Sequence, residues 1–235
     1  MKDTDFYNKE SECYSQKRYA AVPVSYTQFF FNRRLAITKK YISRIIAKTG
    51  GKLSLLELGC ADGIVVRELA RAFPDAFSGL IGIDISPGMI GEAQKQNTTP
   101  YARFMLRDAY MGMPPVDVIT ETGVINYAGF DNDIKFVLSN LKEHGWYVLS
   151  VAGTGSLRNI LKPEKDFKDF RTYREYERLL KETFEIREVT GCGMFIPLIW
   201  RFPALARTTT AVLETMCGNM FPGLCHEKVY LLQKR

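Results

Sequence analysis

The stretch Leu55–Gly63, LLELGCADG, places carboxylates beside a glycine-containing turn. Glu57 stands two residues before Gly59, and Asp62 lies inside the turn, directly before Gly63. A turn that binds a pyrophosphate offers backbone N–H groups at a helix N-terminus and follows the spacing G-x-G-x-x-G. Two carboxylates at this place would repel phosphate groups. The turn therefore favours a ligand with positive charge and disfavours a nicotinamide-dependent reductase.

Further polar residues stand at the ends of the strands that follow. Asp84 ends a second predicted strand, Asp108 and Ala109 end a third, and residues 120–122 (Thr-Glu-Thr) end a fourth. In an open parallel sheet, ligands bind at the carboxyl ends of the strands. We therefore expect these residues to surround one site.

Short apolar runs alternate with helical stretches from Leu53 onward. The predicted strands cover residues 52–59, 78–85, 101–109, 116–122, 145–153, 185–191 and 228–234. The predicted helices cover residues 64–73, 86–97, 131–143 and 169–184, and the second of them starts with Ser86 as N-cap and Pro87 at the first helical position. This alternation predicts crossover units, a mostly parallel sheet and an α/β fold.

The residues E-L-G-C-A-D-G, from Glu57 to Gly63, resemble the first motif of class I S-adenosylmethionine-dependent methyltransferases, which is an acid followed by G-x-G-x-G. The likeness is to small-molecule, type 11/12-like members, and Ala61 replaces the middle glycine with another small residue. The resemblance implies S-adenosyl-L-methionine as cofactor, S-adenosyl-L-homocysteine as product, and a Rossmann-like seven-stranded sheet. That sheet is mostly parallel with an antiparallel last strand and has helices on both faces. The sulfonium and ammonium of the cofactor suit the acidic turn.

The same resemblance implies roles for residues at matching positions. Asp84 would accept hydrogen bonds from both ribose hydroxyls, and Ile85 and Met89 would pack on the adenine. Asp108 and Ala109 would hold the adenine amino group, and the end of the fourth strand would lie beside the methionine moiety. The expected cofactor-binding set is Glu57, Gly59, Cys60, Ala61, Gly63, Asp84, Ile85, Met89, Asp108, Ala109, Glu121, Thr122, Tyr19 and Arg33.

Two regions lie outside the alternation. Residues 1–50 are predicted to form an N-terminal helical cap, 51–191 the cofactor-binding core, 192–226 a helical lid between the last two strands, and 227–235 the final strand. In the cap, aromatic residues such as Tyr19 could enclose the sulfonium. Arg33 or Arg34 could pair with the methionine carboxylate, with helix packing and solvated charge as the alternative roles.

The apolar residues of the lid have two interpretations. They pack on the domain, or they form a wall for a bulky or lipid-like acceptor or a contact with a membrane surface.

Methyl transfer from a sulfonium is an in-line displacement, so alignment of the reactants and exclusion of water are the main tasks of the protein. A hydroxyl acceptor also needs a base, which is most often histidine. His226 precedes the last strand, whose start lies on the ligand side in this family's fold, so His226 is a candidate base; a structural loop contact is the alternative. Tyr127 competes for the role. No metal-ligand pattern stands in the sequence, and no metal is expected.

Composition narrows the classes of partner and location. The 235 residues carry a formal net charge of +6 without a basic block, so no nucleic-acid partner is expected. Five cysteines form no C-x-x-C pair, which argues against a disulfide framework or zinc site. No transmembrane segment or apolar signal peptide is visible, and a cytoplasmic location follows as the default.

The expected function is methyl transfer to oxygen or nitrogen of a small or medium-sized acceptor. The layout of cap, core and lid resembles bacterial methyltransferases of polysaccharide, glycolipid or natural-product tailoring, which implies a sugar, glycolipid or natural-product-like acceptor, including apolar or lipid-linked ones. An RNA or protein methyltransferase and a non-catalytic cofactor-binding partner subunit are the alternatives; TETGVINYAG stands where an N-P-P-Y base-flipping motif would follow the fourth strand. A monomer or homodimer is expected.

Overall fold

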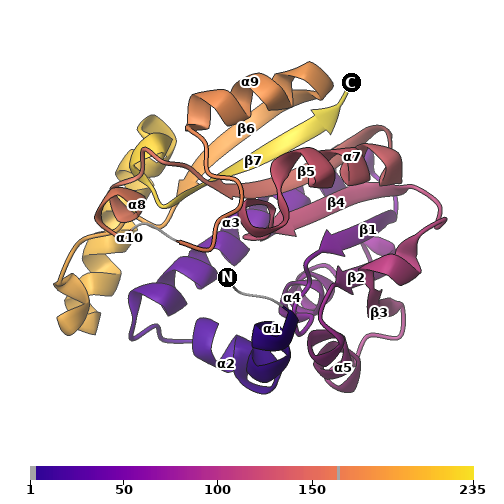
Figure 1. The fold of residues 1–235 in the computed structure, drawn as a ribbon, viewed down its shortest axis with the longest axis horizontal. Coiled ribbons are helices and arrows are strands. Elements are labelled where there is room, and N and C mark those ends of the chain that lie inside the picture. Colours follow the sequence, from indigo (N-terminus) through magenta and orange to yellow (C-terminus); the bar gives the residue numbers. More distant parts are fainter. Residues whose placement is uncertain (1–3, 163–164) are drawn as a thin grey trace.

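The computed structural model describes residues 4–162 and 165–235, and a seven-stranded sheet runs through its centre (Figure 1). The strands are β1 (Leu53–Leu58), β2 (Phe77–Asp84), β3 (Ala102–Leu106), β4 (Val116–Thr122), β5 (Leu141–Ala152), β6 (Phe184–Cys192) and β7 (Glu227–Lys234). Their order is β3-β2-β1-β4-β5-β7-β6. Strands β1 to β5 pair in parallel, and β7 is antiparallel to both β5 and β6. The predicted Rossmann-like sheet with an antiparallel last strand is confirmed.

Helices precede, connect and cover the strands. They are α1 (Thr4–Glu10), α2 (Tyr14–Arg18), α3 (Tyr26–Thr49), α4 (Ile64–Ala72), α5 (Pro87–Lys95), α6 (Ile125–Ala128), α7 (Phe130–Asn140), α8 (Leu157–Leu161), α9 (Tyr173–Thr183) and α10 (Pro203–Met220). Short 3₁₀ turns are η1 (Ser11–Cys13), η2 (Arg107–Tyr110), η3 (Ile199–Arg201) and η4 (Pro222–Leu224). The α1 and α2 helices lie together at one end of the strands, and α10 lies at the edge beside β6 (Figure 1).

The sheet is buried on both faces because its strands are nearly continuous apolar runs. Successive side chains point to opposite faces, so Leu55 packs on the side of α3, α4 and α5, whereas Leu56 packs on the side of α7 and α9. Each face has its own apolar cluster. The result is a three-layer arrangement with the sheet in the middle.

Local signals in the sequence start two of the helices that bound the site. Ser86 precedes α5, and its Oγ accepts a hydrogen bond from the backbone N–H of Met89 at 3.2 Å, while Pro87 occupies the first helical position as predicted. Ser25 starts α3 in the same way, with Gln28 as donor at 3.3 Å. These caps fix where α3 and α5 begin relative to the strand ends.

Several element boundaries differ from the sequence prediction, among them the start of α9 at Tyr173 and the start of β5 at Leu141. The helix predicted over 131–143 ends at Asn140, because Leu141 already pairs with Val116 at the start of β5. The strand predicted over 101–109 ends at Leu106. Asp108 and Ala109 therefore belong to η2, which turns the chain away from the sheet.

The connection between β6 and β7 packs on the sheet edge through a ridge of small or short side chains on α10. Ala206, Thr210, Glu214 and Gly218 recur every four residues and are buried. A Cβ at Gly218 would lie 3.2 Å from the carbonyl oxygen of Gly191 in β6. This ridge brings α10 close to the sheet and leaves its opposite face outward.

Candidate active site

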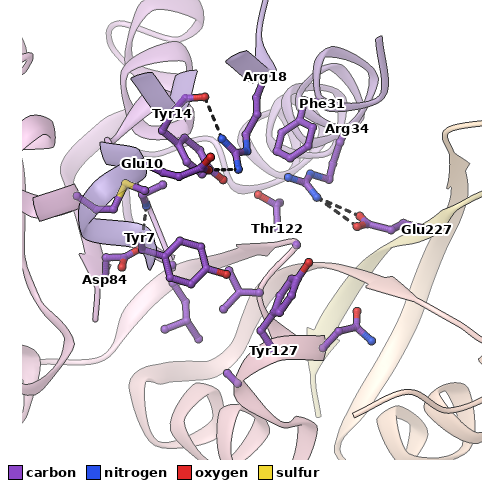
Figure 2. Close-up of a pocket in the computed structure, with 18 of the residues that line it drawn as sticks. Tyr7, Glu10, Tyr14, Arg18, Phe31, Arg34, Asp84, Thr122, Tyr127 and Glu227 are labelled. Atoms are coloured by element: carbon purple, nitrogen blue, oxygen red, sulfur yellow. Dashed lines mark hydrogen bonds and ion pairs between the residues drawn. The ribbon is translucent and has the colours of Figure 1, made fainter. Parts of the chain in front are cut away.

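A cavity of about 550 Å³ lies at the carboxyl ends of β1, β2 and β4. The N-terminal helices α1 and α2 and the first half of α3 roof it, and His226 and Glu227 at the start of β7 close one side. Figure 2 shows Asp84 from the core on one side, Arg34 and Glu227 on the other, and Tyr7 and Tyr127 pointing into the space between them. The volume lies in the range typical of small-molecule sites.

The turn after β1 forms the floor of the cavity. Gly59 and Gly63 adopt positive φ angles of 72° and 80°, and Ala61 between them has a φ of 49°. A Cβ at Gly59 would collide with the side chain of Val124, and one at Gly63 would lie 2.7 Å from the Phe104 ring. The turn can therefore bring its backbone next to a ligand without side chains in the way. Gly59 and Ala61 line the cavity; Gly63 starts α4 beneath it.

Asp84 ends β2 and lies in the cavity wall. One carboxylate oxygen accepts the backbone N–H of Ala61 at 2.9 Å, and the other accepts that of Ser86, also at 2.9 Å. Burial raises the pKa of this carboxyl above its ordinary value. The two N–H bonds fix the side chain and leave further lone pairs for ligand donors. Ile85 and Met89, which follow it, also line the cavity.

Glu57 lies underneath the cavity and is not part of its lining. Its carboxyl group accepts hydrogen bonds from the hydroxyls of Thr120 and Thr122, the latter at 3.3 Å. Burial raises the pKa of Glu57 to about 8, and the hydrogen bonds and the nearby Arg34 oppose that rise. Thr122 lines the cavity, so its hydroxyl group lies between the buried Glu57 and the ligand space.

Arg34 on α3 is the buried cation at the carboxyl end of β4. Its guanidinium donates to both carboxylate oxygens of Glu227, at 3.2 and 3.3 Å, and lies over the Phe31 ring at 4.4 Å. A Cβ at Gly123 would collide with this guanidinium, so the glycine after β4 is what allows Arg34 to sit there. Arg34 and Glu227 thus form a buried ion pair that is part of the cavity lining.

Arg33 and Tyr19, which were predicted to belong to the cofactor-binding set, lie outside the cavity lining. Arg33 leaves the opposite side of α3 and pairs with Glu214 of α10 at 2.9 Å, outside the cavity lining. Tyr19 packs edge-on against Phe31 and is also outside the lining. Arg33 joins α3 to α10, and Tyr19 packs on α3. Of the two neighbouring arginines, Arg34 is the one that lines the cavity.

Several other predicted cofactor residues lie near the site but outside its lining. Cys60 is buried behind the turn, and Asp108 and Ala109 are exposed on η2, where the preceding Arg107 lines the cavity instead. Glu121 points to the opposite face of the sheet and accepts a hydrogen bond from Tyr147. Because strand residues alternate in direction, Thr122 faces the cavity and Glu121 does not.

Sequence reasoning did not identify the residues by which the cap is attached. The Oδ1 atom of Asn8 accepts from the Ser86 hydroxyl at 2.7 Å and from the Gly88 N–H at 3.0 Å. Asp62 accepts both the backbone N–H (3.1 Å) and the hydroxyl of Ser15. Asn8 thus joins α1 to the start of α5, and Ser15 joins α2 to the glycine turn. The polar spacing in residues 8–15 carries no known motif for such contacts.

An ion pair between two residues of the N-terminal helices, Arg18 and Glu10, lines the cavity. Arg18 pairs with Glu10 at 2.6 Å, and its guanidinium lies 4.0 Å from the centre of the Tyr14 ring (Figure 2). All three residues line the cavity, together with Phe6 and Tyr7. Burial raises the pKa of Tyr7 to about 12, so its phenol stays protonated at neutral pH.

Aromatic rings surround the end of the cavity next to β7. His226 stacks near Phe30, with ring centres 4.5 Å apart, and Tyr26 lies 6.0 Å from the same imidazole. Burial lowers the pKa of His226 to about 4, and its Nδ1 has no hydrogen-bond partner among the described residues. Tyr127 packs edge-on against Phe167 at 5.0 Å, and both line the cavity. The imidazole of His226 is therefore neutral at neutral pH.

The described part of the chain shows no set of metal ligands. No group of three or more His, Cys, Asp or Glu side chains within residues 4–162 and 165–235 is arranged to hold a metal ion.

Comparison with known proteins agrees with this geometry. Residues 56–144 match the family model described as a methyltransferase domain. Malonyl-[acyl-carrier protein] O-methyltransferase from Bacillus anthracis is 28% identical over 133 residues, which cover 55% of this chain and 47% of that protein. The chain therefore spans about half the length of this curated relative.

Solved structures extend the likeness over the whole chain. Magnesium protoporphyrin IX methyltransferase from Synechocystis PCC 6803, solved with bound S-adenosylhomocysteine, has a TM-score of 0.67 at 16% identity and covers 99% of this chain and 98% of its own. The plantazolicin methyltransferase BpumL, solved with a desmethyl analogue and S-adenosylhomocysteine, has a TM-score of 0.60 at 17% identity, covering 97% and 90%. At these identities the solved structures show the shared fold.

The glycine turn, the acid at the end of β2, the strand order and the family match define one class. Residues 56–144 match the methyltransferase-domain family, and the whole chain has the fold of S-adenosylmethionine-dependent methyltransferases. The cofactor of that class is S-adenosylmethionine, and a second structure of the Synechocystis enzyme contains it.

Proposed function

We propose that this protein transfers the methyl group of S-adenosylmethionine to an oxygen or nitrogen of a small or medium-sized acceptor. The observation that carries the proposal is the position of Asp84. Its carboxylate is held by the N–H groups of Ala61 and Ser86 at the wall of a cavity whose floor is the open glycine turn. A carboxylate in this position suits a ribose diol, because charge-assisted hydrogen bonds are roughly twice as strong as neutral ones.

The residues present fit the cofactor along the length of the cavity. Ile85 and Met89 offer apolar contacts to an adenine next to Asp84. At the other end, the Arg34 guanidinium offers a partner for the methionine carboxylate, and Thr122 offers a hydroxyl above the buried Glu57. Aromatic rings around this end favour a sulfonium.

Bound S-adenosylmethionine supplies a methyl group on a positively charged sulfur that is already a good leaving group. The acceptor atom donates its lone pair to the methyl carbon as the carbon–sulfur bond breaks, so the sulfur leaves neutral and the acceptor loses a proton. The cap helices exclude water from this space, and the rings of Phe30, Tyr26 and Phe167 hold the acceptor in register. Positioning of this kind can lower a barrier by about 7–11 kcal/mol.

His226 is the base that we propose for a hydroxyl acceptor, with Tyr127 as an acceptor contact or alternative base. The pKa of His226 is held at about 4 by burial, so the imidazole is neutral throughout the neutral pH range. Its Nδ1 has no partner among the described residues. Nδ1 is buried, so the nitrogen that takes the acceptor proton as the new bond forms is Nε2.

A small or medium-sized acceptor is favoured because the cavity is covered by α1, α2 and α3. The named relatives act on different acceptors: a malonyl-acyl carrier protein, a magnesium porphyrin and plantazolicin. The acceptor would occupy the end of the cavity that lies away from Asp84. In this chain that end is formed by the aromatic rings, His226, Arg158 and Lys168.

The test is a mass-spectrometric screen for the gain of one methyl group on matched hydroxyl and amine acceptors, with S-adenosylmethionine present. We expect turnover on at least one acceptor. His226→Gln should slow the hydroxyl acceptor by about 100-fold or more, because general-base catalysis contributes that much, and should slow the amine less. The reaction with hydroxyl should keep its rate from neutral pH down to about pH 5, since His226 protonates only near its lowered pKa.

His144→Gln is the matched control. His144 lies in β5, its backbone carbonyl accepts from Gln233, and it is outside the cavity lining. This variant should behave as the unaltered protein. Equal slowing of hydroxyl and amine acceptors by His226→Gln would remove the base assignment, and cofactor binding without turnover on any acceptor would favour a non-catalytic subunit.

A further inference from the structure

Exposed apolar side chains gather in three segments of this protein. The segments are residues 22–24 between α2 and α3, residues 157–162 of α8 and its end, and residues 198–224 of the lid; together we call them the apolar face. Among the described residues, the large apolar side chains exposed elsewhere are Ile85, Leu106 and Met111. Ile85 lines the cofactor cavity. The remaining exposure is therefore concentrated in one region and needs its own explanation.

The three segments adjoin one another. Arg207 near the start of α10 donates to the backbone carbonyl of Pro23 at 3.1 Å, which joins the lid to the first segment. The guanidinium of Arg158 lies 5.9 Å from the centre of the Phe195 ring, which joins α8 to the chain that leads into the lid. Figure 1 shows α8, α10 and the beginning of α3 together at the same end of the molecule, away from β3.

The outward side of α10 carries large apolar side chains, with the exposed Thr208 and Thr215 between them. Leu205, Val212, Met216 and Met220 recur at helical spacing opposite the buried ridge of Ala206, Thr210, Glu214 and Gly218, and each of the four is more than half exposed. A helix that packs on its own domain needs one apolar side. A second apolar side left in solvent indicates a binding surface.

The charge of the apolar face has one sign. Its segments contain four basic residues, Arg158, Lys162, Arg201 and Arg207, and one acid, Glu214. Glu214 is buried, and its carboxylate is held by Arg33 and by the backbone N–H of Gly193. No acidic side chain of these segments is exposed. Apolar side chains among uncompensated cations match a lipid surface with anionic headgroups.

We infer that the apolar face docks on the surface of an anionic lipid bilayer. The same composition argues against a second copy of this chain, because an isologous interface would bring the cations of both copies together without an exposed acid from these segments to pair with them. No described helix is long and apolar enough to cross a bilayer, so the contact is peripheral. Arg158 belongs both to this face and to the cavity lining, so docking holds the acceptor end of the cavity at the level of the headgroups.

Sedimentation with lipid vesicles tests the inference on the full-length chain. We expect partitioning to vesicles of phosphatidylcholine mixed with phosphatidylglycerol, weak partitioning to phosphatidylcholine alone, and loss of binding as salt is raised. The double variant Val212→Ser, Met216→Ser should lower the partition coefficient by about tenfold or more, since it removes two apolar side chains from the contact. Arg201→Gln should lower it by about fivefold at low salt.

Matched controls separate the face from general surface effects. Met111→Ser removes a methionine that is 74% exposed, compared with 63% for Met216, on the connection between β3 and β4. Arg174→Gln removes an exposed arginine on α9. Both should leave vesicle binding unchanged. Equal losses in control and test variants would overturn the inference.

Two further outcomes would also overturn it. The first is the absence of binding to phosphatidylglycerol vesicles at low salt. The second is a monomer–dimer equilibrium, measured by analytical ultracentrifugation, that Val212→Ser, Met216→Ser abolishes without any vesicle binding. The inference does not depend on methyl transfer. The affinity for S-adenosylhomocysteine, measured on the same preparations, reports separately on the proposed function and on correct folding of each variant.

Discussion

Glu57 is a carboxyl group that the fold keeps out of water directly beneath the cavity. Burial raises its pKa to about 8, and the hydroxyls of Thr120 and Thr122 are its hydrogen-bond partners. A raised pKa means that the folded protein holds this proton more tightly than the unfolded chain does. The contribution of Glu57 to stability is thus greatest below its ordinary pKa and is lost as pH rises toward and through about 8.

We predict that Glu57→Gln makes stability less dependent on pH. The unaltered protein should lose free energy of unfolding on the order of 3 kcal/mol from this group between about pH 5 and about pH 8, and the variant should lose less. Urea unfolding at the two pH values measures the difference. If both proteins show the same decrease, Glu57 is not the buried acid that causes it.

At the scale of single residues, the sequence best predicted those positions that the backbone conformation determines. Gly59, Ala61 and Asp84 line the cavity as expected, because a strand end and a tight turn leave one place for them. Side-chain direction was less predictable. Arg33 and Arg34 differ by about 100° around a helix, and nothing in the sequence gives the rotation of α3 relative to the cavity.

At the scale of elements, the cap is held to the core by few polar contacts. Asn8 accepts two hydrogen bonds from the start of α5, and Asp62 in the glycine turn accepts two from Ser15. The helices α1 and α2 are short, and short helices are marginally stable without such contacts. The cap therefore depends on the glycine turn and on α5, which also contact the cofactor space.

We predict that Asn8→Ala combined with Ser15→Ala loosens the cap without unfolding the core. Three side-chain hydrogen bonds are lost, one of them to the Asp62 carboxylate, so affinity for S-adenosylhomocysteine should fall by about tenfold or more. Trypsin should cut faster at Lys17 and Arg18, with a nearly unchanged unfolding temperature. Ser139→Ala on α7, whose hydroxyl bonds only to Lys135 within that helix, is the control. Unchanged cleavage by trypsin would show that these contacts do not hold the cap.

The elements themselves were largely predictable, and their junctions were less so. Periodicity and caps gave the helices after β1, β2 and β4 and all seven strands, because strong apolar patterns and Ser86-Pro87 act locally. The end of α7 and the η2 turn were not visible. Both depend on pairing with or departure from a neighbouring strand, as in the contact of Val116 with Leu141.

At the scale of the whole molecule, one edge of the sheet brings together the residues of the site. The carboxyl ends of β1, β2 and β4 hold the glycine turn, Asp84 and Thr122, and the antiparallel β7 brings His226 and Glu227 to the same edge. Alternation alone predicted a parallel sheet, whereas the position of the last strand came from the resemblance to the family. His226, at the end of the connection before β7, lines the cavity, and α10 in the same connection forms part of the apolar face.

The proposed function requires that this edge of the sheet binds S-adenosylmethionine. Isothermal titration calorimetry with S-adenosylmethionine and, separately, NADH tests it most directly on the unaltered protein, on Asp84→Asn and on the control Asp75→Asn, which alters an exposed acid. We predict binding of S-adenosylmethionine, none of NADH, a loss of about 10–100-fold in Asp84→Asn and no change in the control. Binding of NADH without S-adenosylmethionine, or unchanged affinity in Asp84→Asn, would contradict the account.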